Sequence, residues 1–188
     1  MDDDWDDYAD DWDENKGVII YAGHTFETLN QEIDLTGLDI LDFGCGTGNL
    51  AAKMAIKANQ IVGVDSSVKM IAILKSKEIK KITALNLELT SGSVSMKFDL
   101  ITASSVFAFV PDFGQSLILL KGLLKSGGKL VQWDWLAASH DGDFGFGFEQ
   151  LEKAYAKAGF KDVNITQPFS LKKETGEMKV VMCVARKL

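Results

Sequence analysis

A glycine-rich stretch, LDFGCGTGNL at residues 41–50, has the composition of a ligand-binding loop. An apolar run precedes it and a helix-like run follows it, so the glycines are expected between a strand and a helix. In an open α/β sheet this position lies at the carboxyl edge, where ligands bind. The dinucleotide fingerprint fails because its third small residue would fall on Asn49, and a P-loop would need a Gly-Lys pair followed by Ser or Thr.

Two acidic residues near this loop indicate the charge of the ligand. Asp42 comes two residues before Gly44, where its carboxylate would repel a pyrophosphate and tolerate a cation. Asp65 follows Gly44 by 21 residues, at the usual position of a carboxylate that accepts hydrogen bonds from a ribose. Together they favour an uncharged or cationic ligand that carries a ribose. A loop brace and a strand-end cap are the structural alternatives for the two acids.

From residue 38 onward, short apolar runs alternate with amphipathic segments, which is typical of βαβ units and a parallel sheet. We expect strands at residues 38–43, 60–64, 82–85, 98–103, 129–135, 162–166 and 179–186, the last two antiparallel. We expect helices at residues 49–58, 68–77 and 148–158, and another from Asp112 to the Gly127-Gly128 pair. The pattern therefore predicts an α/β fold with a seven-stranded, mostly parallel sheet, and the length of 188 residues fits one domain.

The first 14 residues carry nine of the 27 acidic groups and no basic group. Trp5, Tyr8 and Trp12 would form one apolar stripe on a helix, but acids four residues apart repel each other. This helix is therefore expected to form only when it docks onto the body of the protein. The next segment predicts an amphipathic helix that ends near residues 36–37. Its expected buried residues are Ile19, Ala22, Phe26, Leu29 and Ile33.

Several motifs occur in the order found in one enzyme family: YADDWDEN, LDFGCGTG, VGVDSS, KFDLITASSVFAFVPD, LLKSGGKLVQWDW and GFEQLEKAYAKAGFKDV. On these motifs, over nearly its whole length, the chain resembles the class I S-adenosylmethionine-dependent methyltransferases of the small-molecule type. The resemblance implies a Rossmann-like three-layer sandwich with its last strand antiparallel. Residues 37–188 would form the core, and residues 1–36 would form an N-terminal helical lid.

The resemblance also implies S-adenosylmethionine as the cofactor and a set of residues that hold it. The backbone of the glycine loop would pack against the methionine and ribose, Asp65 would bind the ribose hydroxyls, and Asn86 would replace the acid that usually meets the adenine amino group. An asparagine oxygen can still accept that hydrogen bond. The implied cofactor residues are Asp42, Gly44, Cys45, Gly46, Asp65, Ser66, Met70, Asn86, Leu87 and Ser104. The candidate substrate contacts are Tyr8, Trp12, Trp133 and Trp135, for which packing is the alternative.

Methyl transfer is an in-line displacement from a cofactor with an excellent leaving group, so positioning can supply most of the acceleration without a base. For a hydroxyl acceptor of high pKa, the candidate bases are His24, His140 and Asp134. A lone histidine is more often a surface or capping residue. Cys45 is expected to pack inside the loop, because no neighbour in sequence would activate it.

Composition argues against several other classes of protein. Outside the acidic N-terminus the net charge is about +2, so a basic stripe for nucleic acid is missing. No apolar run is long enough to span a bilayer, and the acidic start lacks the features of an export signal, which favours a cytoplasmic protein. The two cysteines, Cys45 and Cys183, lie far apart, so we expect neither a disulfide nor a metal site.

The sequence therefore predicts a methyltransferase that acts on an O, N or C nucleophile of a small molecule. Two alternatives remain open: a cofactor-binding subunit without activity, and a protein methyltransferase. A nicotinamide-dependent oxidoreductase is disfavoured by the glycine spacing and by Asp42. The sequence leaves the methyl acceptor and the oligomeric state open.

Overall fold

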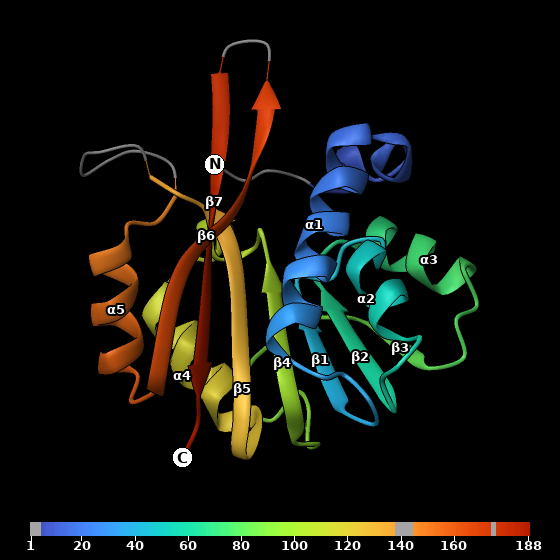
Figure 1. Cartoon of the computed structure of the whole chain (residues 1–188). Helices are drawn as coiled ribbons and strands as arrows, with labels where there is room; N and C mark the ends of the chain where they lie inside the picture. The colour runs from blue at the N-terminus through green and yellow to red at the C-terminus, as the bar shows by residue number, and fades with distance from the viewer. Residues whose placement is uncertain (1–4, 138–144, 174–175) are drawn as a thin grey trace. The chain divides into compact units, whose positions relative to one another are not determined.

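The computed structural model describes residues 5–137, 145–173 and 176–188. Its seven strands have the order β3-β2-β1-β4-β5-β7-β6, and β7 is antiparallel to both of its neighbours (Figure 1). This confirms the predicted seven-stranded, mostly parallel sheet with an antiparallel last strand. Backbone contacts divide the chain into two compact units, residues 1–94 and 95–188. The single domain with a separate N-terminal lid stays a prediction.

The first unit contains three parallel strands with their crossover helices. In the register of the sheet Asp65 pairs with Asn86, so the ends of β2 and β3 bring two predicted cofactor residues side by side. Buried aliphatic residues of β1 and β2, among them Ile40 and Ile61, form the core beneath them. The elements are η1 (Trp5–Tyr8), η2 (Trp12–Glu14), α1 (Lys16–Glu32), β1 (Asp39–Phe43), α2 (Asn49–Met54), β2 (Gln60–Asp65), α3 (Val68–Ser76) and β3 (Ile82–Asn86).

Helix α1 begins at Asn15, whose side chain accepts a hydrogen bond from the Gly17 amide at 2.9 Å. It packs against α2 (Figure 1), but on a different face from the one predicted. Ala22 and Leu29 are buried as expected, whereas Ile19 is 47% exposed. The buried face is completed by Tyr21, Thr25 and Thr28, residues that a strictly apolar pattern leaves out.

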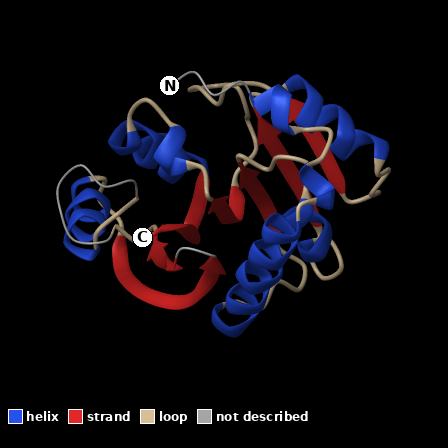
Figure 2. Ribbon diagram, turned by 90° about the horizontal axis from the view of Figure 1, so that it is seen from above, coloured by secondary structure: helices blue, strands red, loops and turns tan. Residues whose placement is uncertain are grey.

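The second unit contains two parallel strands followed by a long antiparallel pair. Helix α5 packs against α4 and β6, and the curved β6–β7 pair is visible in Figure 2. Strand β6 extends well past the predicted residues 162–166. The elements are β4 (Phe98–Ser104), η3 (Phe107–Phe109), α4 (Phe113–Leu123), β5 (Leu124–Trp135), α5 (Phe148–Lys157), β6 (Lys161–Lys173) and β7 (Gly176–Arg186).

The end of α4 corrects one sequence prediction. The Asp112 side chain caps this helix as expected, accepting from the Gln115 amide at 2.9 Å, but the helix ends at Leu123. The Gly127-Gly128 pair, predicted as the helix end, lies inside β5 instead. A Cβ atom at Gly128 would approach the backbone oxygens of residues 98, 99 and 125 to 3.0–3.1 Å. Gly128 therefore allows a close backbone contact within the sheet and does not end the helix.

Replacing Gly128 by alanine should lower the free energy of unfolding by about 1–3 kcal/mol, because the methyl group would overpack these carbonyls. Urea denaturation measures this loss. Gly122→Ala is the matched control, since Gly122 lies in α4 and a Cβ atom there meets no non-local neighbour within 4 Å. The control should be neutral or stabilising by up to about 1 kcal/mol. Equal stability of the two variants would contradict the close contact at Gly128.

Candidate cofactor-binding site

The glycine loop turns sharply between β1 and α2. Gly46 and Gly48 have φ angles of +52° and +83°, in the left-handed region that favours glycine. A Cβ atom at Gly48 would also lie 2.2 Å from Cδ1 of Leu74, so α3 leaves no room for a side chain there. The loop is thus fixed by backbone conformation and by the packing of α3 behind it.

Asp65 connects this loop to the start of α3. Its Oδ2 accepts from the Gly46 amide at 2.8 Å, and its Oδ1 accepts from the Ser67 amide at 2.9 Å. Burial raises the pKa of Asp65, while the amides of Ser67 and Gly46 oppose that rise and nearby Asp6 adds to it. Each carboxylate oxygen can accept a further hydrogen bond, so two more donors can bind the same group.

The cysteine of the loop is a packing residue. Cys45 is buried in a cluster with Ile71, Leu74 and Ala84, and burial raises the pKa of its thiol well above the ordinary value, with Asp42 and Asp65 adding to the rise. Asp42 itself is only 2% exposed. These facts agree with the expected packing role of Cys45 and place Asp42 beneath the loop, close to the thiol.

At the end of β3, Asn86 donates through Nδ2 to the backbone oxygens of Ser66 at 2.8 Å and Asp65 at 3.2 Å. Both bonds use the amide nitrogen, so the side-chain oxygen can still accept a hydrogen bond. The Leu87 amide, expected to meet an adenine nitrogen, donates to the Asp65 carbonyl at 3.0 Å. Contact of Leu87 with a base through this N–H would therefore require exchange of that bond.

Residues 5–15, called the N-terminal strap below, form two short 3-10 helices and not the single helix suggested by their aromatic spacing. The ring of Trp5 lies 5.9 Å from that of Tyr8 and 6.0 Å from that of Trp12. Tyr8, predicted to contact substrate, is 54% exposed. Trp12 lies over the glycine loop, its Nε1 being 3.7 Å from the position of a Cβ atom built on Gly46.

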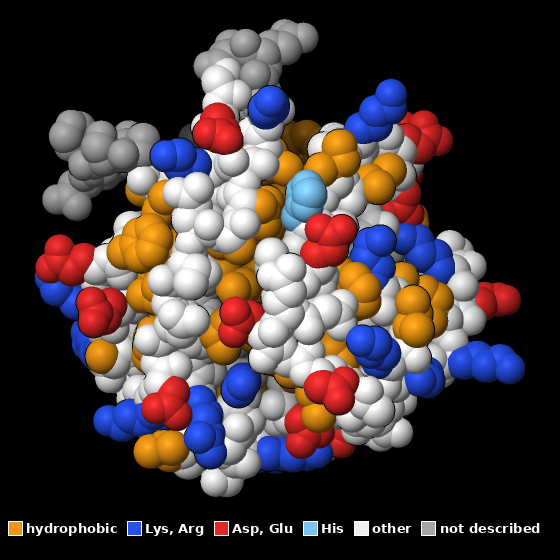
Figure 3. Space-filling view, in the orientation of Figure 1, with side chains coloured by type: hydrophobic (Ala, Val, Ile, Leu, Met, Phe, Trp, Pro, Cys, Tyr) orange, Lys and Arg blue, Asp and Glu red, His pale blue; other side chains and the backbone are white. Residues whose placement is uncertain are grey.

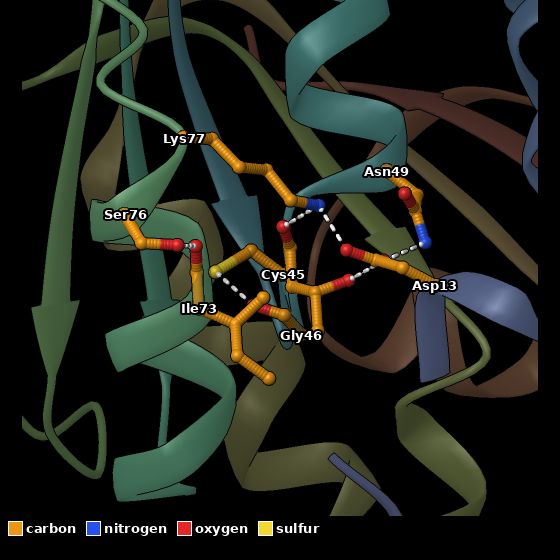
Figure 4. Close-up of polar contacts among 8 residues, drawn as sticks. Asp13, Cys45, Gly46, Asn49, Ile73, Ser76 and Lys77 are labelled. Carbon is orange, nitrogen blue, oxygen red and sulfur yellow. Dashed lines mark hydrogen bonds and ion pairs between the residues drawn. The ribbon is translucent and has the colours of Figure 1, made fainter. Parts of the chain in front are cut away.

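Two acids attach the strap to the first unit. Asp6 accepts from the Ser67 hydroxyl at 2.5 Å and from the Lys69 amide at 3.1 Å, at the start of α3. Asp13 contacts the far side of the glycine loop, as Figure 4 shows. Its Oδ1 accepts from Thr47 Oγ1 at 2.6 Å and Asn49 Nδ2 at 2.9 Å, and its Oδ2 lies 2.7 Å from Lys77 Nζ.

Partial burial raises the pKa of Asp13, but the bonds from Lys77 and Thr47 outweigh it, so the net pKa is lowered. From the sequence the N-terminal acids were expected only to repel each other, and the attachment of the strap by Asp6 and Asp13 was not predicted. The available signal was the Trp-Asp dipeptide, which occurs at residues 5–6 and again at 12–13. The carboxylate of the first copy binds the start of α3, and the ring and carboxylate of the second copy lie on the glycine loop.

The other predicted site residues lie in the second unit. Ser104 ends β4 opposite Trp133 of β5. Trp133 and Asp134 are both 0% exposed, and Trp135 is partly buried. The placement of Trp133 supports packing in the core and not contact with a substrate. Asp134 is equally buried, and its partners are other residues of this unit.

Neither histidine gains support as a base. His24 lies on the surface of α1, with Nδ1 3.2 Å from Glu27 Oε2, and His140 lies outside the described residues. Where the chain is described, no cluster of three or more His, Cys, Asp or Glu side chains could hold a metal ion. No helix in those same parts is both long and apolar enough to cross a bilayer.

Comparison with known proteins shows what the region around this loop is similar to. Residues 41–130 match the family model of a methyltransferase domain. Over these residues the chain is similar to methyltransferase domains. It is 29% identical over 135 residues to a demethylmenaquinone methyltransferase of Lactococcus lactis, and 26% identical over 142 residues to an uncharacterized methyltransferase of Bacillus cereus. The alignments cover 65% and 74% of this chain but only 53% and 65% of the relatives, so the chain spans about half to two thirds of their length.

Solved structures share the fold of this chain. A DhpI complex with S-adenosylhomocysteine superimposes with a TM-score of 0.77 at 14% identity, covering 97% of this chain and 93% of that one. A Thermotoga maritima S-adenosylmethionine-dependent methyltransferase superimposes with a TM-score of 0.73 at 18% identity over the whole of both chains. At such identities the likeness concerns the fold, which is the predicted Rossmann-like one.

Replacing Asp13 by alanine should loosen the strap and cost about 1 kcal/mol, because the ion pair with Lys77 is partly exposed. The lowered pKa means that this contribution is present above the ordinary pKa of an aspartate and is lost as the pH falls below about 4. Limited proteolysis within residues 5–15 measures the loosening at pH 7. Asp11→Ala is the control, since the exposed Asp11 makes no capping hydrogen bond. Equal cleavage of both variants would contradict the attachment.

Proposed function

We propose that this chain is an S-adenosylmethionine-dependent methyltransferase that acts on a small molecule. The observation that carries the proposal is the Asp65 carboxylate, held at the end of β2 by the amides of Gly46 and Ser67. It keeps acceptor capacity for two further donors, which is what the two hydroxyls of a ribose require.

The residues of the first unit fit the cofactor in shape and charge. The left-handed backbone of the loop lets main chain approach a ligand closely, and Asn86 offers an amide oxygen to an adenine amino group. Asp42 and the acids of the strap suit a ligand that carries a sulfonium and an ammonium group. A pyrophosphate in this place would meet the same acids unfavourably, which disfavours a dinucleotide.

When bound, S-adenosylmethionine supplies an activated methyl group with a good leaving group. The chain's own task is to hold the ribose through Asp65, to fix the loop against α3 and to exclude water. The tryptophan rings of the strap suit the last task, since aromatic faces attract cations and repel bulk water. Transfer to an amine acceptor then depends mainly on alignment.

A small-molecule acceptor is supported by charge as well as by family type. On the face drawn in Figure 3, basic and acidic side chains are interspersed, without the broad basic patch that a phosphate backbone would need. A nucleic-acid partner remains disfavoured on that ground, and a cytoplasmic location stays a prediction. The atom that receives the methyl group, whether O, N or C, is left to experiment.

Thermal-shift measurements test the proposal directly. S-adenosylhomocysteine should raise the melting temperature of the full chain, and NAD should not. Incubation with S-adenosylmethionine and a pool of metabolites should then yield S-adenosylhomocysteine. Stabilisation without turnover on any acceptor pool, peptides included, would favour a cofactor-binding subunit, and stabilisation by NAD alone would overturn the proposal.

Asp65→Ala should weaken the binding of S-adenosylhomocysteine by more than about 1 kcal/mol, because charge-assisted hydrogen bonds to the ribose are lost. Isothermal calorimetry measures the change. Asp39→Ala serves as the control, since Asp39 lies at the opposite end of β1 and binds Asn59 and Gln60. Unchanged affinity in the Asp65 variant would remove the ribose assignment.

We also propose that the N-terminal strap closes over the cofactor. Its residues lie against two predicted cofactor contacts: Asp6 is close to Asp65, and Trp12 lies over Gly46. The strap is held there by side-chain bonds and carries few buried residues, so opening it costs less than unfolding the sheet. Ligand exchange through such an opening is consistent with a lid.

A chain that begins at Asn15 keeps the cap of α1 and loses residues 5–14 of the strap. Its complex with S-adenosylhomocysteine should dissociate about tenfold faster or more, which corresponds to about 1.4 kcal/mol of lost contact. Stopped-flow fluorescence or surface plasmon resonance measures the rate, and urea denaturation should show a smaller change in the stability of the core. An unchanged dissociation rate would leave the strap as packing alone.

A further inference from the structure

The chain from the end of α3 to β3 mixes aliphatic and charged residues, and several of them line a cavity of about 220 Å³ in the first unit. Four of the lining residues are aliphatic: Leu74, Ile79, Ile82 and Ala84. Leu74 and Ala84 are buried, and the other two are partly buried. The volume lies below the roughly 300–1,000 Å³ of pockets for drug-sized ligands, so the cavity suits a ligand of about the size of one amino acid.

The aliphatic part of this cavity shares its residues with the packing behind the glycine loop. Leu74 and Ala84 belong to the buried cluster that contains Cys45, and Ile82 packs against the same cluster. A Cβ atom at Gly48 would lie 2.2 Å from Cδ1 of Leu74. Leu74 therefore both lines the cavity and fixes the loop, so a ligand that contacts Leu74 also affects the loop.

Three charged side chains, those of Lys75, Glu78 and Lys80, also line the cavity. Within the described parts of the chain, none of them forms a salt bridge. Charges of both signs beside aliphatic groups are complementary to a ligand that is a zwitterion and carries an apolar side chain. A ligand with a single charge would meet a like charge in the same cavity.

Glu78 has two unfavourable local features that point to a use for its carboxylate. It follows the C-cap of α3 with a φ angle of +50°, a left-handed conformation in which glycine is usual after a helix. Its negative charge also lies at the C-terminal end of this helix, where the helix dipole favours a cation. Lys75, in the last turn, suits that dipole without any ligand, whereas Glu78 does not.

We propose that this cavity is an effector site for an amino acid with an aliphatic side chain, and that its occupation raises the affinity of the glycine loop for the cofactor. The carboxylate of the effector pairs with Lys75 and Lys80, its ammonium group pairs with Glu78, and its side chain contacts Leu74. A filled cavity restricts Leu74, so the loop loses less conformational freedom when the cofactor binds. The effect on cofactor affinity rests on the proposed function.

The first test titrates leucine into the full chain and follows the amide NMR signals. The signals of Ile79, Ile82 and Gly48 should shift together, with one dissociation constant in about the millimolar range, as expected for a ligand of this size. Two analogues should bind about fivefold more weakly, because each loses an ion pair: 4-methylpentanoate lacks the ammonium group, and 3-methylbutylamine lacks the carboxylate. Absence of the shifts, or equal affinity of either analogue, would overturn the proposal.

Charge-neutralising variants test which residues recognise the effector. In Glu78→Gln, which keeps the size of the side chain, leucine should bind no better than 4-methylpentanoate. In the double variant Lys75→Gln with Lys80→Gln, leucine should bind no better than 3-methylbutylamine. Glu32→Gln is the matched control, because Glu32 is an exposed acid at the end of α1 and does not line the cavity, and it should bind leucine like the wild type. A preference for leucine that persists in Glu78→Gln would contradict the site.

The second test measures the affinity for S-adenosylhomocysteine by calorimetry, with and without saturating leucine. Leucine should raise this affinity about fivefold or more, and S-adenosylhomocysteine should raise the affinity for leucine by the same factor, because coupling between two sites is reciprocal. Unchanged affinities in both directions would overturn the effector role. Failure of the proposed function would differ, since S-adenosylhomocysteine would then not bind at all, while leucine would still shift the signal of Gly48.

Discussion

The candidate site depends on one partly buried carboxylate, Asp65, and on the two backbone amides that it binds. The bond from Gly46 fixes the glycine loop, and the bond from Ser67 fixes the start of α3, so one side chain sets the distance between two backbone segments. Without Asp65 the loop would keep only the backbone bonds from the amides of Gly44 and Cys45 to the Val64 carbonyl of β2, at 2.9 and 3.1 Å. Because Asp65 pairs with Asn86 in the sheet register, the end of β3 lies beside the same carboxylate.

Specific hydrogen bonds also explain why the acidic N-terminus folds against the first unit. Nine acids in 14 residues would repel each other as a free helix, yet two of them are matched by donors around the loop. Asp6 caps α3 a second time, and Asp13 pairs with Lys77 across the loop. These bonds place the tryptophan rings and leave other acids, such as Asp7 and Asp11, exposed. A segment of this composition is therefore folded by specific contacts and not by helix propensity.

Much of the fold could be predicted from the sequence, because βαβ alternation is a strong pattern and each strand of the parallel part begins or ends within a few residues of its expected limit. The errors have physical causes. Gly127-Gly128 was interpreted as a helix end, but Gly128 meets three carbonyls inside β5, a contact that no local pattern encodes. The buried face of α1 uses Tyr21 and Thr25, which count as polar in an apolar pattern.

For the site, spacing predicted where Asp65 and Asn86 lie, since both follow from strand ends in one sheet. It could not predict which side chains contact residues 34 to 64 positions away, as Asp13 and Asp6 do. Nor could it separate Trp133, which is fully buried, from Trp135, which is partly buried, because residues two positions apart lie on the same face of a strand and differ only in what covers them.

The central claim is that Asp65 holds the ribose of S-adenosylmethionine beside the glycine loop. A crystal structure of the full chain with S-adenosylhomocysteine tests it most directly. The account predicts both ribose hydroxyls within hydrogen-bond distance of the Asp65 carboxylate, with Trp12 covering the ligand. A nucleoside bound elsewhere, or an Asp65 carboxylate that contacts only Gly46 and Ser67 in the complex, would contradict it.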